Sequence, residues 1–181
     1  MGKRTGFIIT CEHAGNQVPA EYVHLFAGYE GLLAGHRGWD PGALECAREL
    51  ASRLKAPLLF STVTRLLVDL NRSPGHPGLY SEATRGLSQE EKARIFALYH
   101  RPHWRAVEAQ VERFIDAGRC VVHIAVHSFT PVLDGEERRR FPEDAYMGIE
   151  IEINQRFPLG GGEDWEEMKR AVVETPPAAD G

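Results

Sequence analysis

The sequence lacks the features that mark several large classes of protein. It has no long apolar segment near its N-terminus, as a signal peptide would, and no run of transmembrane length. It contains neither a GxGxxG motif nor a P-loop, and it has no internal repeat. These absences argue against a membrane protein, a repeat architecture and the two common nucleotide-binding motifs.

Cysteine and positive charge are also scarce. The 3 cysteines, Cys11, Cys46 and Cys120, are scattered and form no CxxC pair, so we expect reduced thiols in a cytoplasmic protein. Lys and Arg number 21 against 26 Asp and Glu, and the net charge of −5 gives a nucleic-acid role no electrostatic support. The chain has 181 residues, of which 43% are hydrophobic. This is enough for one domain with its own core.

The stretch that carries the most chemistry is 121–131, VVHIAVHSFTP. Its β-branched residues favour a buried strand, and His127 and Ser128 stand at its end, before Pro131. Catalytic and ligand groups of open α/β sheets collect where strands end. His127 is therefore a candidate metal ligand or proton carrier, with a hydrogen-bonded core histidine as the alternative.

A second strand, 7–11 (FIITC), also ends in a histidine. Glu12 and His13 follow it, and small residues then permit a tight turn. Because adjacent side chains of a strand point to opposite faces, we expect only one of the pair to enter the site, and we assign His13.

The loop 35–42 (GHRGWDPG) adds two candidates. Asp40 is predicted to cap a helix that runs through 43–54, with Pro41 at its first position. His36 lies in a glycine-flanked loop, where a packing role is less natural. A short buried strand is predicted at 57–61, after this helix.

The next segment, 62–72 (TVTRLLVDLNR), is predicted to be a strand with Arg65 near its start. Arg72 and Asn71 at its end suit the capture of a carboxylate, which a guanidinium binds in bidentate fashion. A long loop is expected at 73–86, a helix capped by Ser88, and a second helical pattern as far as 117. Between the helices, His100, Arg101 and His103 are expected to be exposed or capping groups, although one can point into the cleft.

The segment 147–153 (MGIEIEI) is predicted to be a further strand. Glu150 and Glu152 alternate with isoleucines and so share one face of the sheet, where a general base is a natural occupant. A last short helix is expected at 165–173. The alternation of strands with helices predicts an α/β layered sheet.

Several of these motifs occur together and in a familiar order: CEHAGNQVP, HRGWDPGA, TRLLVDLNRS, YHRPHW, HSFTP and GIEIEINQRF. Over nearly its whole length the chain resembles the N-formylglutamate amidohydrolase family. The resemblance implies a three-layer α/β fold like that of zinc carboxypeptidases and aspartoacylases, with a mixed, mostly parallel sheet between helices. It also implies metal-dependent cleavage of the amide of N-formylglutamate or a related N-acyl amino acid.

Carried over by position, the resemblance implies a site for Zn²⁺ or another divalent metal. His13 and His127 would be ligands, His36 the third, and Asp40 the alternative third ligand or a partner of a ligand. Asn71 and Arg72 resemble a clamp for the substrate carboxylate, with Arg65 and Ser128 as further substrate-binding candidates. Glu152 matches the family's catalytic glutamate better than Glu150 does.

One departure from the family is large, because relatives carry a substantial stretch near 135–140 where this chain has a few charged residues. We expect a single domain over 1–181 that lacks this segment. The expected partner is a small N-acyl amino acid, with no nucleic acid or membrane, and the oligomeric state is not predicted. The alternative function is a catalytically impaired metal- or carboxylate-binding protein of the same fold. A nucleophilic hydrolase using Ser128 with His127 ranks lower, since sequence neighbours rarely form a triad.

Overall fold

The computed structural model describes residues 5–128, 132–133, 136–137 and 150–152. In chain order the elements are β1 (Thr5–Cys11), the 3₁₀ helix η1 (Ala20–Phe26), α1 (Glu30–Ala34), α2 (Ala43–Leu54), β2 (Leu58–Phe60), α3 (Gln89–Ile95), the π-helical turn η2 (Phe96–His100), α4 (Arg101–Asp116), β3 (Cys120–Ala125), β4 (Val132–Leu133), β5 (Glu136–Glu137) and β6 (Glu150–Glu152).

The main sheet has the strand order β2-β1-β3-β6. The central strand β1 is parallel to both of its neighbours, and β6 adds an antiparallel edge next to β3. The register pairs Ile9 with Leu58 on one side and with Ile124 on the other. The predicted α/β class with a mostly parallel sheet is therefore confirmed.

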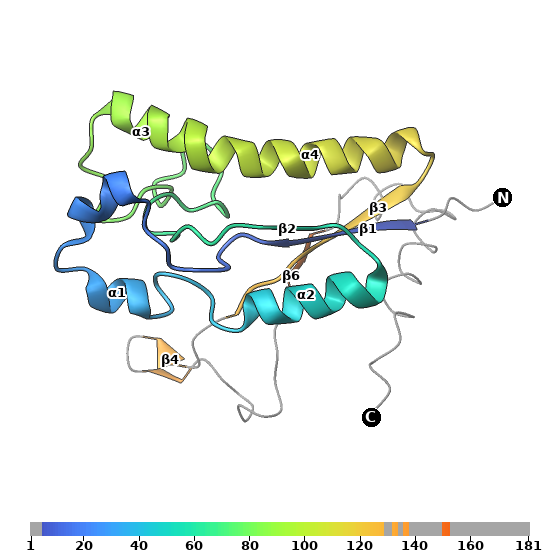
Figure 1. Ribbon diagram of the computed structural model, residues 1–181, viewed down its shortest axis with the longest axis horizontal. Helices are drawn as coiled ribbons and strands as arrows, with labels where there is room; N and C mark the ends of the chain where they lie inside the picture. Colours follow the sequence, from blue (N-terminus) through green and yellow to red (C-terminus); the bar gives the residue numbers. More distant parts are fainter. Residues whose placement is uncertain (1–4, 129–131, 134–135, 138–149, 153–181) are drawn as a thin grey trace.

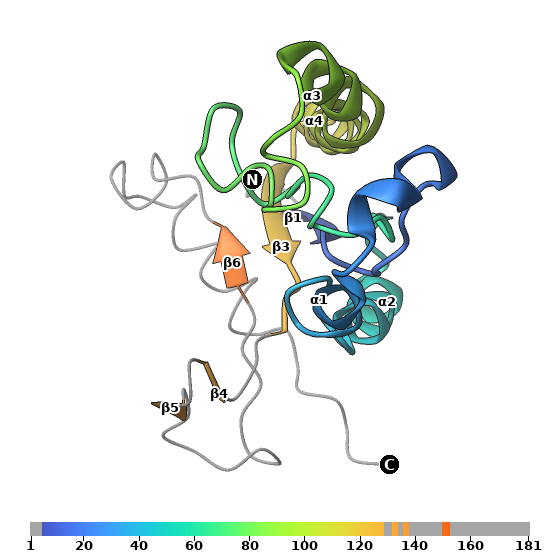
Figure 2. The ribbon, with the colours of Figure 1, turned by 90° about the vertical axis from the view of Figure 1, so that its left-hand side faces the viewer.

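Helices cover both faces of this sheet (Figures 1 and 2). On one face α2 packs its alanines, among them Ala43 and Ala47, against Ile9 of β1 and Val122 of β3. The other face is covered by α4, which continues α3 through the π-helical turn η2. This arrangement is consistent with the predicted three layers, whereas the likeness to zinc carboxypeptidases stays a prediction.

Several predicted elements agree with the structure. The strands expected at 7–11, at 57–61 and within 121–131 correspond to β1, β2 and β3, although β2 is half-buried to exposed where a buried strand was predicted. The Ser88 side chain accepts a hydrogen bond from the Glu91 amide at the start of α3, as predicted. Part of the strand expected at 147–153 is described as β6, while the helix expected at 165–173 lies outside the described residues.

Two predictions of local structure were wrong. The residue before α2 is Gly42, in a left-handed conformation with φ of 80°, so Asp40 does not cap that helix. Residues 62–72 form successive turns and make a single bridge, between Val63 and Gln17. Side chains capture the amides that a strand would need, because Thr64 Oγ1 accepts from Leu66 and Asp69 Oδ1 accepts from Asn71.

The leucines of this turn segment explain why its apolar run resembled a strand. Leu66, Leu67 and Leu70 are buried in a second core with Tyr22 of η1 and Ile95 of α3. Within the described part of the chain, every helix falls short of the length and apolar character that would let it cross a membrane.

Candidate metal centre

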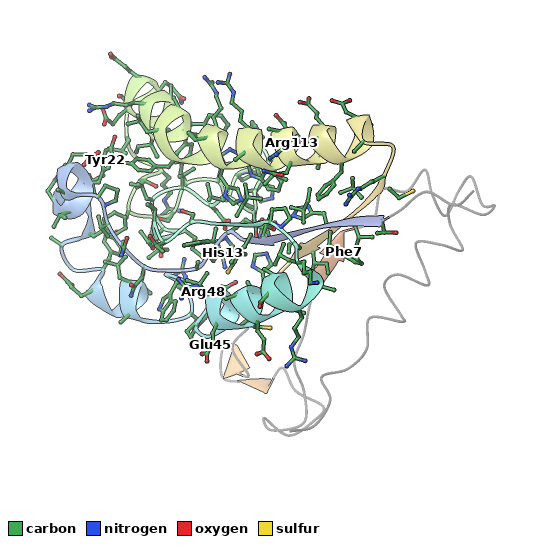
Figure 3. The ribbon with its side chains drawn as sticks, turned by 45° about the vertical axis from the view of Figure 1, so that its right-hand side comes forward. Phe7, His13, Tyr22, Glu45, Arg48 and Arg113 are labelled. Atoms are coloured by element: carbon green, nitrogen blue, oxygen red, sulfur yellow. The ribbon has the colours of Figure 1, made fainter. Side chains whose placement is uncertain are left out.

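Three side chains from separate segments converge at one edge of the sheet. His13 follows β1, Asp40 lies in the loop before α2, and His127 follows β3. One ligand atom from each lies within 4.8 Å of the others. The Nδ1 atoms of His127 and His13 lie 2.8 Å and 3.4 Å from Asp40 Oδ2. Figure 3 shows His13 between the layer of α4, which carries Arg113, and that of α2, which carries Arg48.

The parallel pairing of β1 and β3 brings the two histidines together, because parallel strands end at the same edge. The third residue, Asp40, lies in a loop that packs tightly against the segments that follow β1 and β2. Its amide donates to the His13 carbonyl at 2.9 Å, and the Gly38 carbonyl accepts from Thr64 Oγ1 at 2.9 Å. A side chain at Gly38 would overlap the Leu33 carbonyl, so glycine is required for the loop to pack this closely.

A buried carboxylate holds the far side of the His13 ring. Nε2 of His13 lies 2.7 Å from Oδ1 of Asp69, and both side chains are buried. Arg65 binds Oδ2 of the same carboxylate at 2.8 Å and lies 3.6 Å from Asp40 Oδ1. Burial lowers the pKa of His13, but its hydrogen bonds to Asp40 and Asp69 outweigh this, so the pKa is raised above its ordinary value.

Glu12 and His13 are turn residues that follow β1 directly, and both contact residues of this group. His127 lies between them: its ring centroid is 5.0 Å from that of His13, and its Nε2 is 3.4 Å from Glu12 Oε2. Of the pair, the group of three includes His13, whereas Glu12 lies beside the group in contact with His127, so the entry of only one into the site stays a prediction.

His103 of α4 also reaches this centre, with Nε2 at 3.6 Å from Glu12 Oε1. Its side chain is only 6% exposed, so the alternative left open for one of these groups, that it points inward, applies to His103. Burial raises the pKa of Glu12, but polar contacts with His103 and Thr10 and the charge of His127 lower it to about 2. The Asp40 carboxyl is affected in the same way: burial raises its pKa, and hydrogen bonds from His127 and His13 bring it down to about 2.

The donor set of His13, Asp40 and His127 fits a divalent metal such as zinc. Two imidazole nitrogens and one carboxylate oxygen are the ligands of many catalytic zinc sites, and atoms bound tetrahedrally at such a site lie about 3.4 Å apart. The His13 Nδ1–Asp40 Oδ2 distance of 3.4 Å matches this spacing. The 2.8 Å contact between His127 and Asp40 is a hydrogen bond. A bound metal would displace the proton of this hydrogen bond.

The other predicted site residues are distributed around this group. His36 is exposed and lies outside the group of three. Arg65 is held by Asp69, while the Ser128 hydroxyl donates to the Pro41 carbonyl at 2.8 Å. The Asn71 amide lies 3.4 Å from His127 Nε2. Backbone pairing sets Glu152 opposite His123 and Glu150 opposite Ala125, on the strand next to β3.

A cavity of about 560 Å³ adjoins the group of three on the side of Asn71 and Arg72. Its lining includes Asn71, Arg72, His100, Arg101, Trp104 and Arg105. The Arg72 side chain is 46% exposed and its Nε lies 4.0 Å from Asp69 Oδ2, whereas that of Arg65 is 26% exposed and bound to Asp69. Arg72 is therefore the better placed of the two to meet a ligand.

Cys11, next to Glu12, is buried and faces α2 with the core side chains of β1. Burial and the neighbouring carboxylates of Glu12 and Asp40 raise the pKa of its thiol to about 12. At neutral pH the sulfur stays protonated, which supports a packing role for Cys11.

We predict that the metal-free protein loses stability in acid. The folded-state pKa values of Glu12 and Asp40, about 2, lie below their ordinary values of 4.5 and 3.8. Groups with depressed pKa values stabilise the fold above their unfolded pKa, and this stabilisation is lost as the pH falls towards the folded pKa. For Glu12 it is on the order of 3 kcal/mol. Urea unfolding with a chelator present should show a falling free energy of unfolding between about pH 4.5 and pH 2.

Glu12→Gln should reduce this acid dependence, because the amide does not titrate. Glu91→Gln on α3, which alters a partly exposed carboxylate, should leave it unchanged. Equal acid dependence in wild type and Glu12→Gln would show that Glu12 is not a source of this stability.

The sequence arguments did not assign Asp69 to the site, and they left Glu12 and His103 as unassigned alternatives. A carboxylate inside an apolar run was a signal for Asp69, which stands in LLVDL. For His103 the signal was its place on the helix: Val107, one turn later, faces the core, and residues four apart share a helix face. Glu12 had been recognised but was set aside in favour of its neighbour.

Comparison with known proteins identifies a family and a solved structure of similar fold. Residues 5–150 match the protein-family model described as FGase, N-formylglutamate amidohydrolase. Among solved structures, the chain is similar to the gene product Atu2144 from Agrobacterium tumefaciens, with 31% sequence identity and a TM-score of 0.68. That match covers 75% of this chain and 57% of the other, so the chain spans little more than half of that protein. Among curated proteins, no sequence matches significantly.

Proposed function

Since this chain belongs to the N-formylglutamate amidohydrolase family, we propose that it is a metal-dependent hydrolase that cleaves the amide of N-formylglutamate or a related N-acyl amino acid. The observation that carries the proposal is the convergence of His13, Asp40 and His127 at one edge of the sheet. A cytoplasmic location, predicted from the cysteines, is part of the same proposal.

The three converging residues would hold the metal through His13 Nδ1, a carboxylate oxygen of Asp40 and His127 Nδ1. A bound Zn²⁺ would supply Lewis acidity towards the amide carbonyl and lower the pKa of a bound water. Asp69 keeps the ring of His13 oriented through the 2.7 Å contact at Nε2, and Arg65 in turn keeps Asp69 in place. We therefore propose that Arg65 supports the metal site by holding Asp69 in place.

The substrate carboxylate is proposed to bind Arg72, beside the cavity that Asn71 also lines. A guanidinium can engage a carboxylate through two parallel hydrogen bonds, which fixes the orientation of the amide as well as its position. Arg101 and Arg105 line the same cavity and add positive charge. Ser128 is engaged with the Pro41 carbonyl, and we propose that it helps to secure the loop that carries Asp40.

Glu152 is proposed as the general base that takes a proton from the attacking water and returns it to the leaving amine. Its strand, β6, is paired with β3, whose end carries His127, and the register places Glu152 opposite His123 and Glu150 opposite Ala125, two positions nearer to that end. The choice of Glu152 therefore rests on its match to the family's catalytic glutamate. Glu150 is the alternative base on the same strand.

The proposal is tested by metal analysis of the purified protein followed by an assay of N-formylglutamate hydrolysis with and without a chelator. We expect about one divalent ion per chain and turnover that is lost with the chelator and restored by Zn²⁺. Metal binding without turnover of any N-acyl amino acid would favour a metal- or carboxylate-binding protein of the same fold. Turnover that is indifferent to metal removal would contradict the proposal.

We predict that Arg72→Lys impairs substrate binding although the positive charge is kept. A lysine cannot form the two parallel hydrogen bonds of a guanidinium, so KM for a carboxylate-bearing substrate should rise roughly tenfold or more. The measurement compares that substrate with its carboxamide analogue, for which the variant should differ little from wild type.

Arg53→Lys on α2 is the matched control, since Arg53 makes an exposed pair with Glu49 far from the cavity lining. It should leave both KM values unchanged. If wild type and Arg72→Lys discriminate equally between carboxylate and carboxamide, Arg72 does not bind the carboxylate.

A further inference from the structure

Glu12 is a buried carboxylate without an ordinary hydrogen bond among the residues that the structure describes. The residue is 1% exposed, and neither of its oxygens has a hydrogen-bond partner there. The two oxygens instead face two histidines, with Oε2 at 3.4 Å from His127 Nε2 and Oε1 at 3.6 Å from His103 Nε2. A buried charge is costly unless it is paired, so these two imidazoles stabilise it, together with the polar contact to Thr10 described above.

The two nitrogens of His127 face different carboxylates. Nδ1 lies 2.8 Å from Asp40 Oδ2, and Nε2 faces Glu12. A neutral imidazole has one N–H and one lone pair, and only the nitrogen with the lone pair can bind a metal. A carboxylate is purely an acceptor, so Asp40 accepts the Nδ1–H at 2.8 Å in the metal-free protein, and Glu12 is placed to accept the proton at Nε2 once a metal takes the Nδ1 lone pair. The Asn71 amide, also 3.4 Å from Nε2, can present either its oxygen or its nitrogen and does not decide the tautomer.

His13 has the same arrangement, built from different residues. Its Nδ1 faces Asp40 and its Nε2 lies 2.7 Å from Asp69. Arg65 binds the Asp69 carboxylate, and His103 contacts the Glu12 carboxylate in the corresponding way. Each histidine of the group of three therefore has Asp40 on Nδ1, a second buried carboxylate on Nε2, and a cationic or N–H group behind that carboxylate.

We propose that Glu12 is a positioning residue for His127: it accepts the Nε2–H of that ring, which leaves the Nδ1 lone pair directed to the metal, and His103 holds the Glu12 carboxylate in place. The inference rests on the proposed metal-dependent function. Partners of this kind orient the ligand ring, fix its tautomer and raise its basicity. Glu12 then orients His127, which follows β3, while Asp69 orients His13, the neighbour of Glu12 in the sequence.

The test measures Zn²⁺ affinity by competition with a chromophoric chelator, together with the visible absorption of the Co²⁺-loaded protein. Glu12→Gln keeps the size of the side chain and can still contact both histidines, so folding should be retained. We expect its Zn²⁺ affinity to fall about 10- to 100-fold, the usual cost of losing such a partner. The Co²⁺ bands should shift as well, since the donor strength of His127 changes.

His103→Gln should weaken Zn²⁺ binding by a smaller factor than Glu12→Gln. The matched control is His100→Gln, because His100 is buried one helical turn earlier and donates to the Arg72 carbonyl instead. It should leave the Zn²⁺ affinity and the Co²⁺ bands unchanged. Wild-type affinity and bands in Glu12→Gln would overturn the inference while the proposed function stood. A wild-type protein that binds no metal would overturn both.

A measurement on the Zn²⁺-loaded wild-type protein needs no substitution and decides the case if Glu12→Gln does not fold. Long-range ¹H–¹⁵N correlation spectra report which imidazole nitrogen carries the proton. The expected result is a His127 ring protonated at Nε2. A ring protonated at Nδ1 would overturn the inference.

Discussion

Asp40→Asn is expected to abolish stoichiometric metal binding, whereas His36→Asn is expected to leave it intact. Asp40 is the residue that both histidines share, since its Oδ2 lies 2.8 Å from His127 Nδ1 and 3.4 Å from His13 Nδ1. An amide of the same size carries no charge and is a poor ligand for Zn²⁺, so the loss should exceed the 10- to 100-fold typical of a partner that only orients a ligand. His36 is exposed, outside this group.

The measurement is the metal content after dialysis against a limiting concentration of Zn²⁺, with circular dichroism to check folding. His13→Ala and His127→Ala should each lose the metal while the fold persists. Full metal content in Asp40→Asn together with its loss in His36→Asn would return the third ligand to His36, and full content in both histidine variants would refute the site as a whole.

Glu152→Gln is expected to lower kcat by roughly two to four orders of magnitude, the usual worth of a positioned general base. Glutamine keeps the size and hydrogen-bonding capacity of the side chain but cannot accept the proton. Metal content should be unchanged, because Glu152 is not proposed as a ligand. Steady-state kinetics on N-formylglutamate at saturating Zn²⁺ provide the measurement.

Glu150→Gln is the matched control, since it makes the same change two residues away on β6. It should cost far less in kcat. The reverse pattern would assign the base to Glu150, and loss of metal in Glu152→Gln would make Glu152 a ligand. If neither variant affects turnover, the base lies elsewhere and the proposed mechanism fails.

The sequence predicted the sheet better than the segments that connect it. β-branched runs identified β1 and β3, and the histidines at their ends did meet, because two parallel strands share an edge. The run 62–72 was apolar enough for a strand but folds into turns. There the side chains of Thr64 and Asp69 bind backbone amides, a competition that hydrophobic periodicity does not report.

Only part of the candidate site could be predicted, again because local patterns do not report contacts between distant segments. Asp40 followed by Pro41 is a typical helix start, so a local rule accounted for a residue whose side chain contacts distant segments. The pair of Glu12 and His103 depends on α4 crossing β1, a tertiary contact between residues 91 positions apart that no local pattern contains. Local rules thus find residues that end an element, but not those that meet across layers.

The π-helical turn at Phe96–His100 affects how His103 must be sought in related proteins. A π turn holds one residue more than an α turn, and successive residues of an α-helix are related by a rotation of about 100° around the helix axis. If the same number of residues formed a regular α-helix here, α3 could stay packed as it is only with His103 swung away from Glu12 by about that angle. A homologue with an uninterrupted α-helix here would carry the equivalent imidazole or hydroxyl at a neighbouring position of its sequence. Column-by-column alignment would miss such a residue, whereas superposition of the helices would reveal it.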